Sequence, residues 1–267
     1  MNKKQDLLVG IIQEYIKCKE PIGSVFLKEK RSICLSSATI RNYFKVLESE
    51  GALFQPHASS GRIPTTSALS TYWRGVLNYL LDSILCVNST KLDSICRDYR
   101  IFCVIAPKES NELQEIIATK ENFLILKFSR GEVVIKKSEA ILRFLQPFIN
   151  MDIADITRVS VEVGASDLAL KLIALEQVDM AKNTAKYGVS NLKEILESSY
   201  FEQIFSGKIM LKKANGIYTS EFVPSGFVCV IHDVVNVDSK EKNKCARMLV
   251  FGSLLCDFEG FYTDLVA

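Results

Sequence analysis

One stretch near the N-terminus, "LSSATIRNYFKVLESEGALFQPHASSGRIPT" at Leu35–Thr65, constrains the fold more than any other part of the chain. In its first half Ile40, Phe44 and Leu47 fall on one stripe at helical spacing. Gly51 is a suitable residue to end that helix. In its second half a short apolar run, a loop rich in Ser and Gly, and a second short run predict a β-hairpin. The stretch therefore predicts a helix followed directly by a hairpin.

Two further helices are predicted before this one. Apolar residues recur at helical spacing from Leu7 to Ile16, and "KEPIG" ends that helix. Ser24 is a suitable N-cap for a short second helix, and Ser36 or Ser37 for the third. Two short helices joined by a tight turn are typical of a helix-turn-helix. With the hairpin behind them, they predict a winged-helix domain.

The outward face of the third helix carries the side chains that we expect to meet DNA. Arg can donate to guanine and Asn can pair with adenine in the major groove. Small residues at the start of a helix let its amides approach a phosphate. A cation on the hairpin is favoured near the DNA backbone or the adjacent minor groove. The candidate DNA-binding residues are Ser36, Ser37, Thr39, Arg41, Asn42, Lys45, His57 and Arg62.

The charge distribution agrees with this prediction. The net charge of the 267 residues is only +2. Residues 1–75 hold 11 Lys and Arg against 6 Asp and Glu, whereas the remaining residues hold 22 against 25. A basic first part on a nearly neutral body is typical of a nucleic-acid-reading domain joined to another domain.

The composition argues against several other classes of protein. The chain has eight Cys and two His, with no Cys-x-x-Cys spacing, so we expect no metal site and no cofactor. Most of the cysteines lie in apolar strings such as "FCVIA" and "FVCVI", where a thiol behaves as a small buried hydrophobe. An enzyme would need a nucleophile beside His57 or His232, and neither has that spacing.

The sequence also carries no sign of secretion or of a membrane. "MNKKQDLL" lacks the apolar core of a signal peptide. The longest apolar stretch, Val76–Val87, is shorter than the roughly 20 residues that a membrane-spanning helix needs. We therefore expect a cytoplasmic protein without a membrane span.

Three strings resemble the N-terminal signature of the HrcA family of heat-inducible transcription repressors. They are "EPIGS" at Glu20–Ser24, "LSSATIRNYFKVLESEGALFQPH" at Leu35–His57 and "SGRIPT" at Ser60–Thr65. The resemblance implies a winged-helix repressor, without catalytic activity, that binds an inverted-repeat operator called CIRCE upstream of chaperone genes. It also implies that the chaperonin GroEL keeps the repressor active. An inverted repeat requires two-fold symmetry, so we expect a homodimer.

The resemblance implies an α+β multidomain chain. We expect a winged-helix DNA-binding domain at 1–75, a linker helix at 76–94, a GAF-like α/β domain at 95–137 and 187–267, and an inserted dimerisation segment at 138–186. "GVSNL" at Gly188–Leu192 resembles a family string, whereas "GSLLCDF" at Gly252–Phe258 replaces the usual Gly-Pro-Thr-Arg-Met-Asp-Tyr. The alternative is a winged-helix regulator controlled by a small-molecule ligand of the GAF-like domain, whose mark would be a pocket with convergent polar groups.

Overall fold

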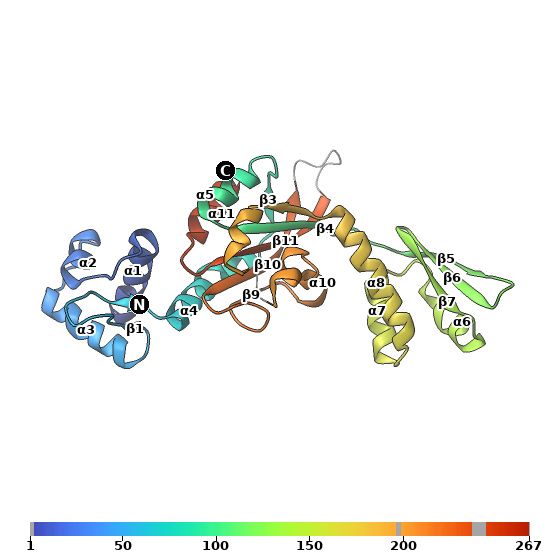
Figure 1. The fold of residues 1–267 in the computed structure, drawn as a ribbon, viewed down its shortest axis with the longest axis horizontal. Coiled ribbons are helices and arrows are strands. Elements are labelled where there is room, and N and C mark those ends of the chain that lie inside the picture. The colour runs from blue at the N-terminus through green and yellow to red at the C-terminus, as the bar shows by residue number, and fades with distance from the viewer. Residues whose placement is uncertain (1–2, 196–198, 237–243, 267) are drawn as a thin grey trace.

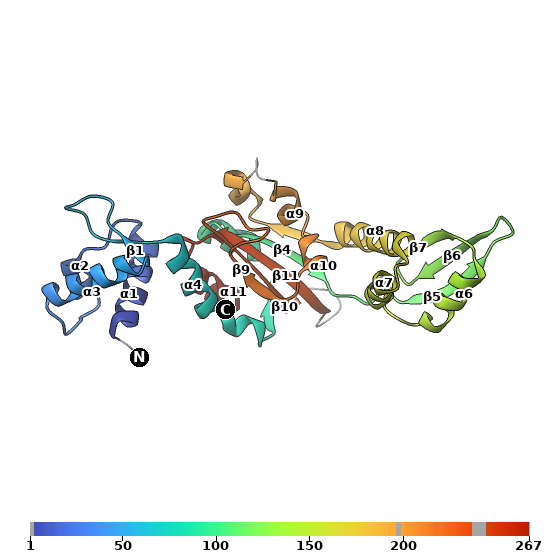
Figure 2. The same ribbon diagram turned by 90° about the horizontal axis from the view of Figure 1, so that it is seen from below.

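The computed structural model describes residues 3–195, 199–236 and 244–266, which form an elongated α+β structure (Figure 1). Helices at one end, a central sheet and a smaller sheet with its own helices follow one another along the long axis (Figures 1 and 2). The helices are α1 Lys3–Cys18, α2 Ser24–Lys30, α3 Ser37–Ser49, α4 Thr66–Val76, α5 Leu92–Tyr99, α6 Glu139–Leu145, α7 Ile153–Glu162, α8 Ser166–Asn183, α9 Phe201–Phe205, α10 Ile209–Lys212 and α11 Phe258–Val266, with 3-10 turns η1 Leu77–Leu81, η2 Gln146–Phe148 and η3 Val189–Ile195. The strands are β1 Leu53–Phe54, β2 Ile63–Pro64, β3 Leu85–Val87, β4 Phe102–Pro107, β5 Leu113–Ala118, β6 Phe123–Phe128, β7 Gly131–Lys136, β8 Ala185–Tyr187, β9 Gly216–Tyr218, β10 Phe227–Asn236 and β11 Lys244–Ser253.

The three predicted N-terminal helices and the two strands after them are confirmed as elements. Helices α1 to α3 pack around one core, and β1 pairs with β2 antiparallel. The N-cap prediction for α2 is wrong, because Gly23 occupies that position and no side chain caps the helix. The core of this region consists of Leu7, Ile11, Ile22, Leu27, Ile40, Phe44, Leu47 and Leu53.

The strings "EPIGS" and "SGRIPT" lie against each other. Ile22 and Arg62 form an isolated antiparallel bridge, with both backbone N–H···O distances 2.9 Å. A Cβ at Gly61 would lie 2.4 Å from the carbonyl carbon of Ile22. Only glycine allows this approach, so the hairpin is fastened to the connection between α1 and α2.

The central sheet has strands in the order β3-β10-β11-β4-β8, with β9 also paired to β10. All of these pairs are antiparallel except β10 with β3. In β10, Val228 and Val230 face one core, whereas Cys229 and Ile231 face the other. A sheet covered on both faces needs apolar residues at every position, which explains "FVCVI". The structure therefore confirms the prediction that Cys229 is a buried apolar residue.

Each face of this sheet has its own cover. One core includes residues of α4, α5 and α11, and the other includes residues of η3, α9 and α10. Asn191 at the start of η3 donates from its Nδ2 atom to the carbonyls of Cys96 and Ile101, each at 2.9 Å. Gly188 has a φ of 65°, and a Cβ there would lie 2.3 Å from the carbonyl oxygen of Ile101. The family string "GVSNL" thus joins η3 to the end of α5.

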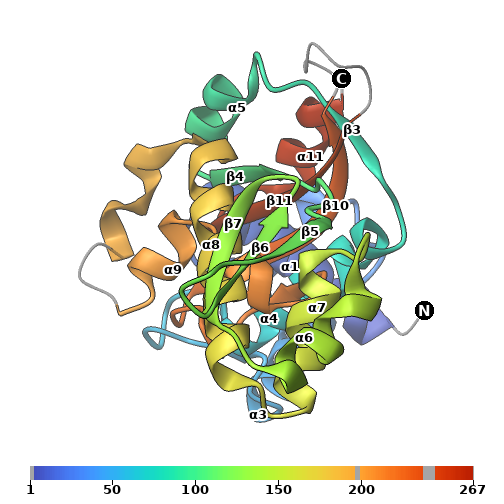
Figure 3. The same cartoon turned by 90° about the vertical axis from the view of Figure 1, so that its right-hand side faces the viewer.

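The smaller sheet has the order β5-β6-β7 and forms a separate core with α6, α7 and α8. In Figure 3 it lies in front of the central sheet. The insert predicted at 138–186 is therefore placed too late at its start, because β5 to β7 belong to it and not to the central sheet. The chain leaves β4 at Pro107 and returns at β8, its antiparallel neighbour. Since adjacent strands place these ends side by side, residues 108–184 form the inserted part.

The linker helix predicted at 76–94 is also wrong. Helix α4 ends at Val76, η1 covers 77–81, and β3 then joins the central sheet through parallel pairing with Val234 to Asn236. Buried Leu77 and Leu80 belong to the core that includes residues of α4, α5 and α11. Pairing with β10 thus stabilises strand where apolar content alone suggested helix.

The N-terminal helices are attached to the central part through α1 and α4. Ile12 and Ile16 of α1 share the core that α4 and α11 form with the sheet. The Trp73 Nε1 atom donates to the Leu254 carbonyl at 2.8 Å, and Lys19 donates to the carbonyl of Leu255. The divergent string "GSLLCDF" is therefore where the two parts meet.

The cysteines divide into two groups. The structure confirms buried thiols at Cys96, Cys103, Cys229 and Cys256 and exposes Cys18, Cys34, Cys86 and Cys245. Burial raises the pKa of the Cys103 thiol well above its usual value. In the described part of the chain, no helix combines the length and apolar character that crossing a membrane requires.

Candidate nucleic-acid interface

Helix α3 presents the polar face that its periodicity predicts. Ile40, Phe44 and Leu47 are buried, whereas Arg41, Asn42 and Lys45 are exposed. The helix lies at the end of the molecule away from the insert (Figure 1). Three side chains able to contact bases and phosphates therefore share an accessible helix face.

Hydroxyl groups cap the start of α3. The Ser36 Oγ atom accepts the Thr39 amide at 3.0 Å, and the two hydroxyl oxygens lie 2.8 Å apart. This is an N-cap, which leaves the amides of the first turn directed outward. Ser37, the first residue of the helix, is half-buried. The helix terminus can accept an anion.

The hairpin carries the two remaining candidates in different environments. His57 is exposed, and its backbone accepts from and donates to Ser60 in a tight loop. The Arg62 side chain is only 13% exposed and forms an ion pair with Glu48 of α3 at 3.2 Å. The sequence placed Arg62 at the base of the hairpin as a DNA-facing cation. In the structure it joins the hairpin to α3.

One contact of a candidate residue could not be predicted from the sequence. The Arg41 Nε atom donates to the Ser24 hydroxyl oxygen at 3.3 Å. The sequence predicts Ser24 only as an N-cap, because serine is a preferred capping residue. Only the packing of α2 on α3 brings the two side chains together, and no signal in the sequence shows that packing.

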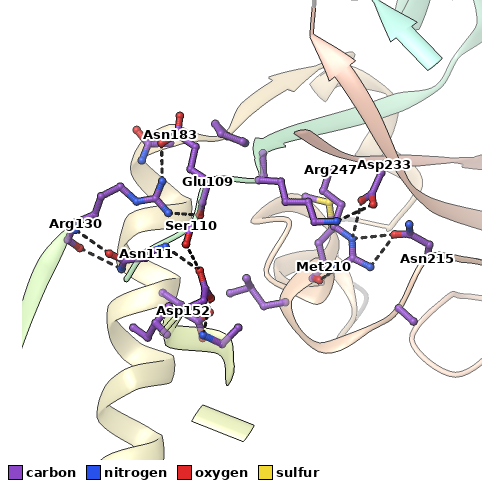
Figure 4. A pocket seen from close by; sticks show the side chains of 18 residues that line it. Glu109, Ser110, Asn111, Arg130, Asp152, Asn183, Met210, Asn215, Asp233 and Arg247 are labelled. Atoms are coloured by element: carbon purple, nitrogen blue, oxygen red, sulfur yellow. Dashed lines mark hydrogen bonds and ion pairs between the residues drawn. The ribbon is translucent and has the colours of Figure 1, made fainter. Parts of the chain in front are cut away.

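A second candidate site is a cavity of about 850 Å³ between the central sheet and the insert (Figure 4). On the sheet side, Asp233 lies 4.0 Å from Arg247 and pairs at 2.8 Å with Lys108, the first residue of the insert. The guanidinium of Arg247 also donates to Asn215 and to the backbone carbonyl of Lys213. This wall is thus a network of paired charges.

The insert forms the other wall of this cavity. The backbone amide of Asn111 donates to the carboxylate of Asp152 at 2.9 Å, and Arg130 forms an ion pair with Glu109 at 2.5 Å. Burial, together with the nearby Asp152, raises the pKa of Glu176 to about 7. The cations in the cavity are engaged by protein groups: Arg247 by residues of the central part, Arg130 by Glu109 of the insert, and Lys108 by Asp233 of β10. Among the described residues, no group of His, Cys, Asp and Glu is arranged to hold a metal.

Comparisons with known proteins agree on one family. Residues 73–267 match the family model for the HrcA C-terminal domain. The heat-inducible transcription repressor HrcA of Helicobacter pylori is 30% identical over 265 residues, covering 99% of this chain and 95% of the relative. The repressor of the same name from Corynebacterium diphtheriae is 51% identical over 70 residues, covering 26% and 20%.

A solved structure described only as a hypothetical protein has a similar fold. It is 21% identical, with a TM-score of 0.51, and the match covers 100% of this chain and 97% of the other. At this identity the likeness concerns the fold alone.

Proposed function

The chain belongs to the HrcA family of heat-inducible transcription repressors, and on that premise we propose that it represses chaperone genes by binding a CIRCE-type inverted repeat as a homodimer. In this proposal residues 1–75 are a winged-helix domain, with α2 and α3 as its helix-turn-helix and β1–β2 as its wing. The observation that carries the proposal is the exposed face of α3 with Arg41, Asn42 and Lys45.

Each candidate residue has a different role in this proposal. Arg41 and Asn42 read base edges in the major groove, and Lys45 neutralises a phosphate. The capped start of α3, with Ser36, Ser37 and Thr39, binds a second phosphate. His57 approaches the DNA backbone from the wing. Arg62 acts indirectly, because its ion pair with Glu48 fixes the wing against α3.

The insert is the dimerisation segment in this proposal, and its bounds follow the sheet topology at 108–184. Val161, Leu170 and Val178 on α7 and α8 are exposed, with 67% of Leu170 open to solvent. A contiguous exposed apolar patch marks an interaction site, and in this proposal these three residues belong to one such patch. The central sheet and its helices then form the GAF-like domain. The dimer places two α3 helices on the two half-sites.

Chaperonin control is the regulatory part of the proposal. The mean hydropathy of the chain is +0.14, and its central sheet is apolar on both faces. A chain of this kind exposes apolar surface when it partly unfolds, and chaperonins bind such surface. GroEL would thus return the heated repressor to its DNA-binding form.

A second candidate function is control by a small-molecule ligand of the GAF-like domain. The cavity at Lys108, Asp152, Glu176 and Arg247 favours it, because polar groups line both walls. A ligand there would raise the melting temperature of the protein and change its affinity for DNA.

The experiment that tests the proposed function is a footprint on the DNA upstream of chaperone genes from the source genome. The proposal predicts protection of an inverted repeat. It also predicts that protection is lost after mild heating and returns only with GroEL. If the footprint shows no protected inverted repeat, the CIRCE-type operator is excluded. If the heated protein regains full DNA protection without GroEL, chaperonin control is excluded.

A further inference from the structure

Ser24 is a buried polar residue that its own helix does not use. It is the first residue of α2, and only 9% of it is exposed. The N-cap of the helix is Gly23, and no side chain accepts from the first turn of α2. Burying a hydroxyl is unfavourable unless another group forms a hydrogen bond with it. The partner of Ser24 lies on a different helix.

That partner is Arg41 of α3, whose Nε atom donates to the Ser24 hydroxyl oxygen at 3.3 Å. A guanidinium has five N–H donors, and this contact uses the one nearest the stem. The four donors on Nη1 and Nη2 are not needed for it. A bidentate contact with guanine uses donors at that outer end of the side chain. The bond to Ser24 is therefore compatible with base reading.

The support of Ser24 is itself fixed. Ile22, two residues earlier, is fully buried and forms the two-way backbone bridge with Arg62. Close contact with Gly61 holds the same segment. Ser24 thus sits on backbone that is tied to the hairpin, and it can hold the Arg41 side chain in one orientation.

Holding an Arg in its binding orientation reduces the conformational entropy that it loses on meeting DNA. We propose that Ser24 is a positioning residue that orients the Arg41 guanidinium for a base edge, and so increases operator preference without touching DNA. This inference rests on the proposed function, because it requires that Arg41 reads a base.

The test is a double-mutant cycle with Ser24→Ala, Arg41→Ala and the double variant in the full chain. Affinity is measured for the inverted repeat defined by the footprint and for unrelated duplex DNA of the same length. Ser67→Ala, at an exposed serine on α4, is the control. Melting curves follow the fold of each variant.

We expect Ser24→Ala to lower the ratio of the two affinities about 2- to 10-fold, the range of one hydrogen bond. Binding to unrelated DNA and its salt dependence should stay unchanged. In the Arg41→Ala background, Ser24→Ala should have no further effect on the ratio.

Two outcomes would overturn this inference and leave the proposed function intact. Arg41→Ala could lower the ratio while Ser24→Ala leaves it unchanged. Alternatively, Ser24→Ala could lower it equally with and without Arg41, as a purely structural role through α2 would. If Arg41→Ala itself leaves the ratio unchanged, the base-reading role in the proposed function fails, and the inference fails with it.

Discussion

At the residue scale, Asn191 shows how one side chain can hold an element end. Its amide group donates to the Cys96 and Ile101 carbonyls, and Gly188 allows the chain to come close enough. The string "GVSNL" could be found in the sequence, but its role depends on α5, which lies almost 100 residues earlier. The residues of this string are adjacent in the sequence, whereas the backbone carbonyls that they contact are far from it in the sequence.

We predict that Asn191→Ala destabilises the protein by about 1–3 kcal/mol, because the part-buried carbonyls of Cys96 and Ile101 each lose a hydrogen bond from the Asn191 side chain. Urea unfolding measures this change. Asn42→Ala, on the exposed face of α3, is the matched control and should alter stability by less than about 0.5 kcal/mol. Equal stability of the two variants would contradict the role of Asn191.

His232 provides a pH prediction. Burial lowers the pKa of this imidazole from 6.5 to about 4. The unfolded chain therefore binds the proton more readily between these pH values, and stability falls as the pH drops from 6.5 towards 4. Glu176 acts in the opposite direction, because burial raises the pKa of its carboxyl from 4.5 to about 7.

His232→Gln should reduce the loss of stability on acidification by up to about 1.4 kcal/mol per pH unit. Urea unfolding at pH 6.5, 5.5 and 4.5 gives the slope for both proteins. Since Glu176 is present in both, its contribution cancels in the comparison. Identical slopes would show that His232 does not titrate as its burial requires.

At the element scale, the hairpin depends on its contact with the connection between α1 and α2. We predict that Gly61→Ala destabilises the N-terminal region by at least about 1–3 kcal/mol, because the new Cβ meets the Ile22 backbone. Operator affinity should fall with it. Gly75→Ala in α4 is the control, since a Cβ added there meets no atom within 4 Å beyond its neighbours and the nearby backbone of its own helix. If Gly61→Ala and Gly75→Ala have the same melting temperature, the close contact between Gly61 and Ile22 does not stabilise the protein.

Elements differed in how far the sequence predicted them. Helices α1 to α3 were predictable because apolar residues at i, i+3 and i+4 are a local signal. Strand β3 was predicted as helix, because its strand state comes from pairing with β10, about 150 residues later. The start of the insert was missed for the same reason, since β5 to β7 have strand patterns that do not reveal which sheet they join. For β3 and for β5 to β7, the structure depends on which distant strand each one pairs with.

At the scale of the whole molecule, the N-terminal helices and the central part share one core. Ile12 is buried where α1 meets α4, and Trp73 bonds to Leu254. We predict that Ile12→Ala lowers the free energy of unfolding by about 2–4 kcal/mol. The urea midpoints of the N-terminal helices and of the central part should fall together. Fluorescence of Trp73, the only tryptophan, reports the contact, and circular dichroism reports the whole fold. Val25→Ala, on an exposed face of α2, is the control. Separate transitions by the two probes would contradict the shared core.

The central claim is that the exposed face of α3 reads an operator. The most direct measurement is operator affinity against salt concentration for wild type, Arg41→Ala, Asn42→Ala and Lys45→Ala. We predict that Arg41→Ala and Asn42→Ala each lose about 1–3 kcal/mol of specific binding and flatten sequence preference. Lys45→Ala should weaken specific and non-specific binding alike and reduce the salt slope by about 1. Unchanged operator affinity in correctly folded Arg41→Ala and Asn42→Ala would contradict the account.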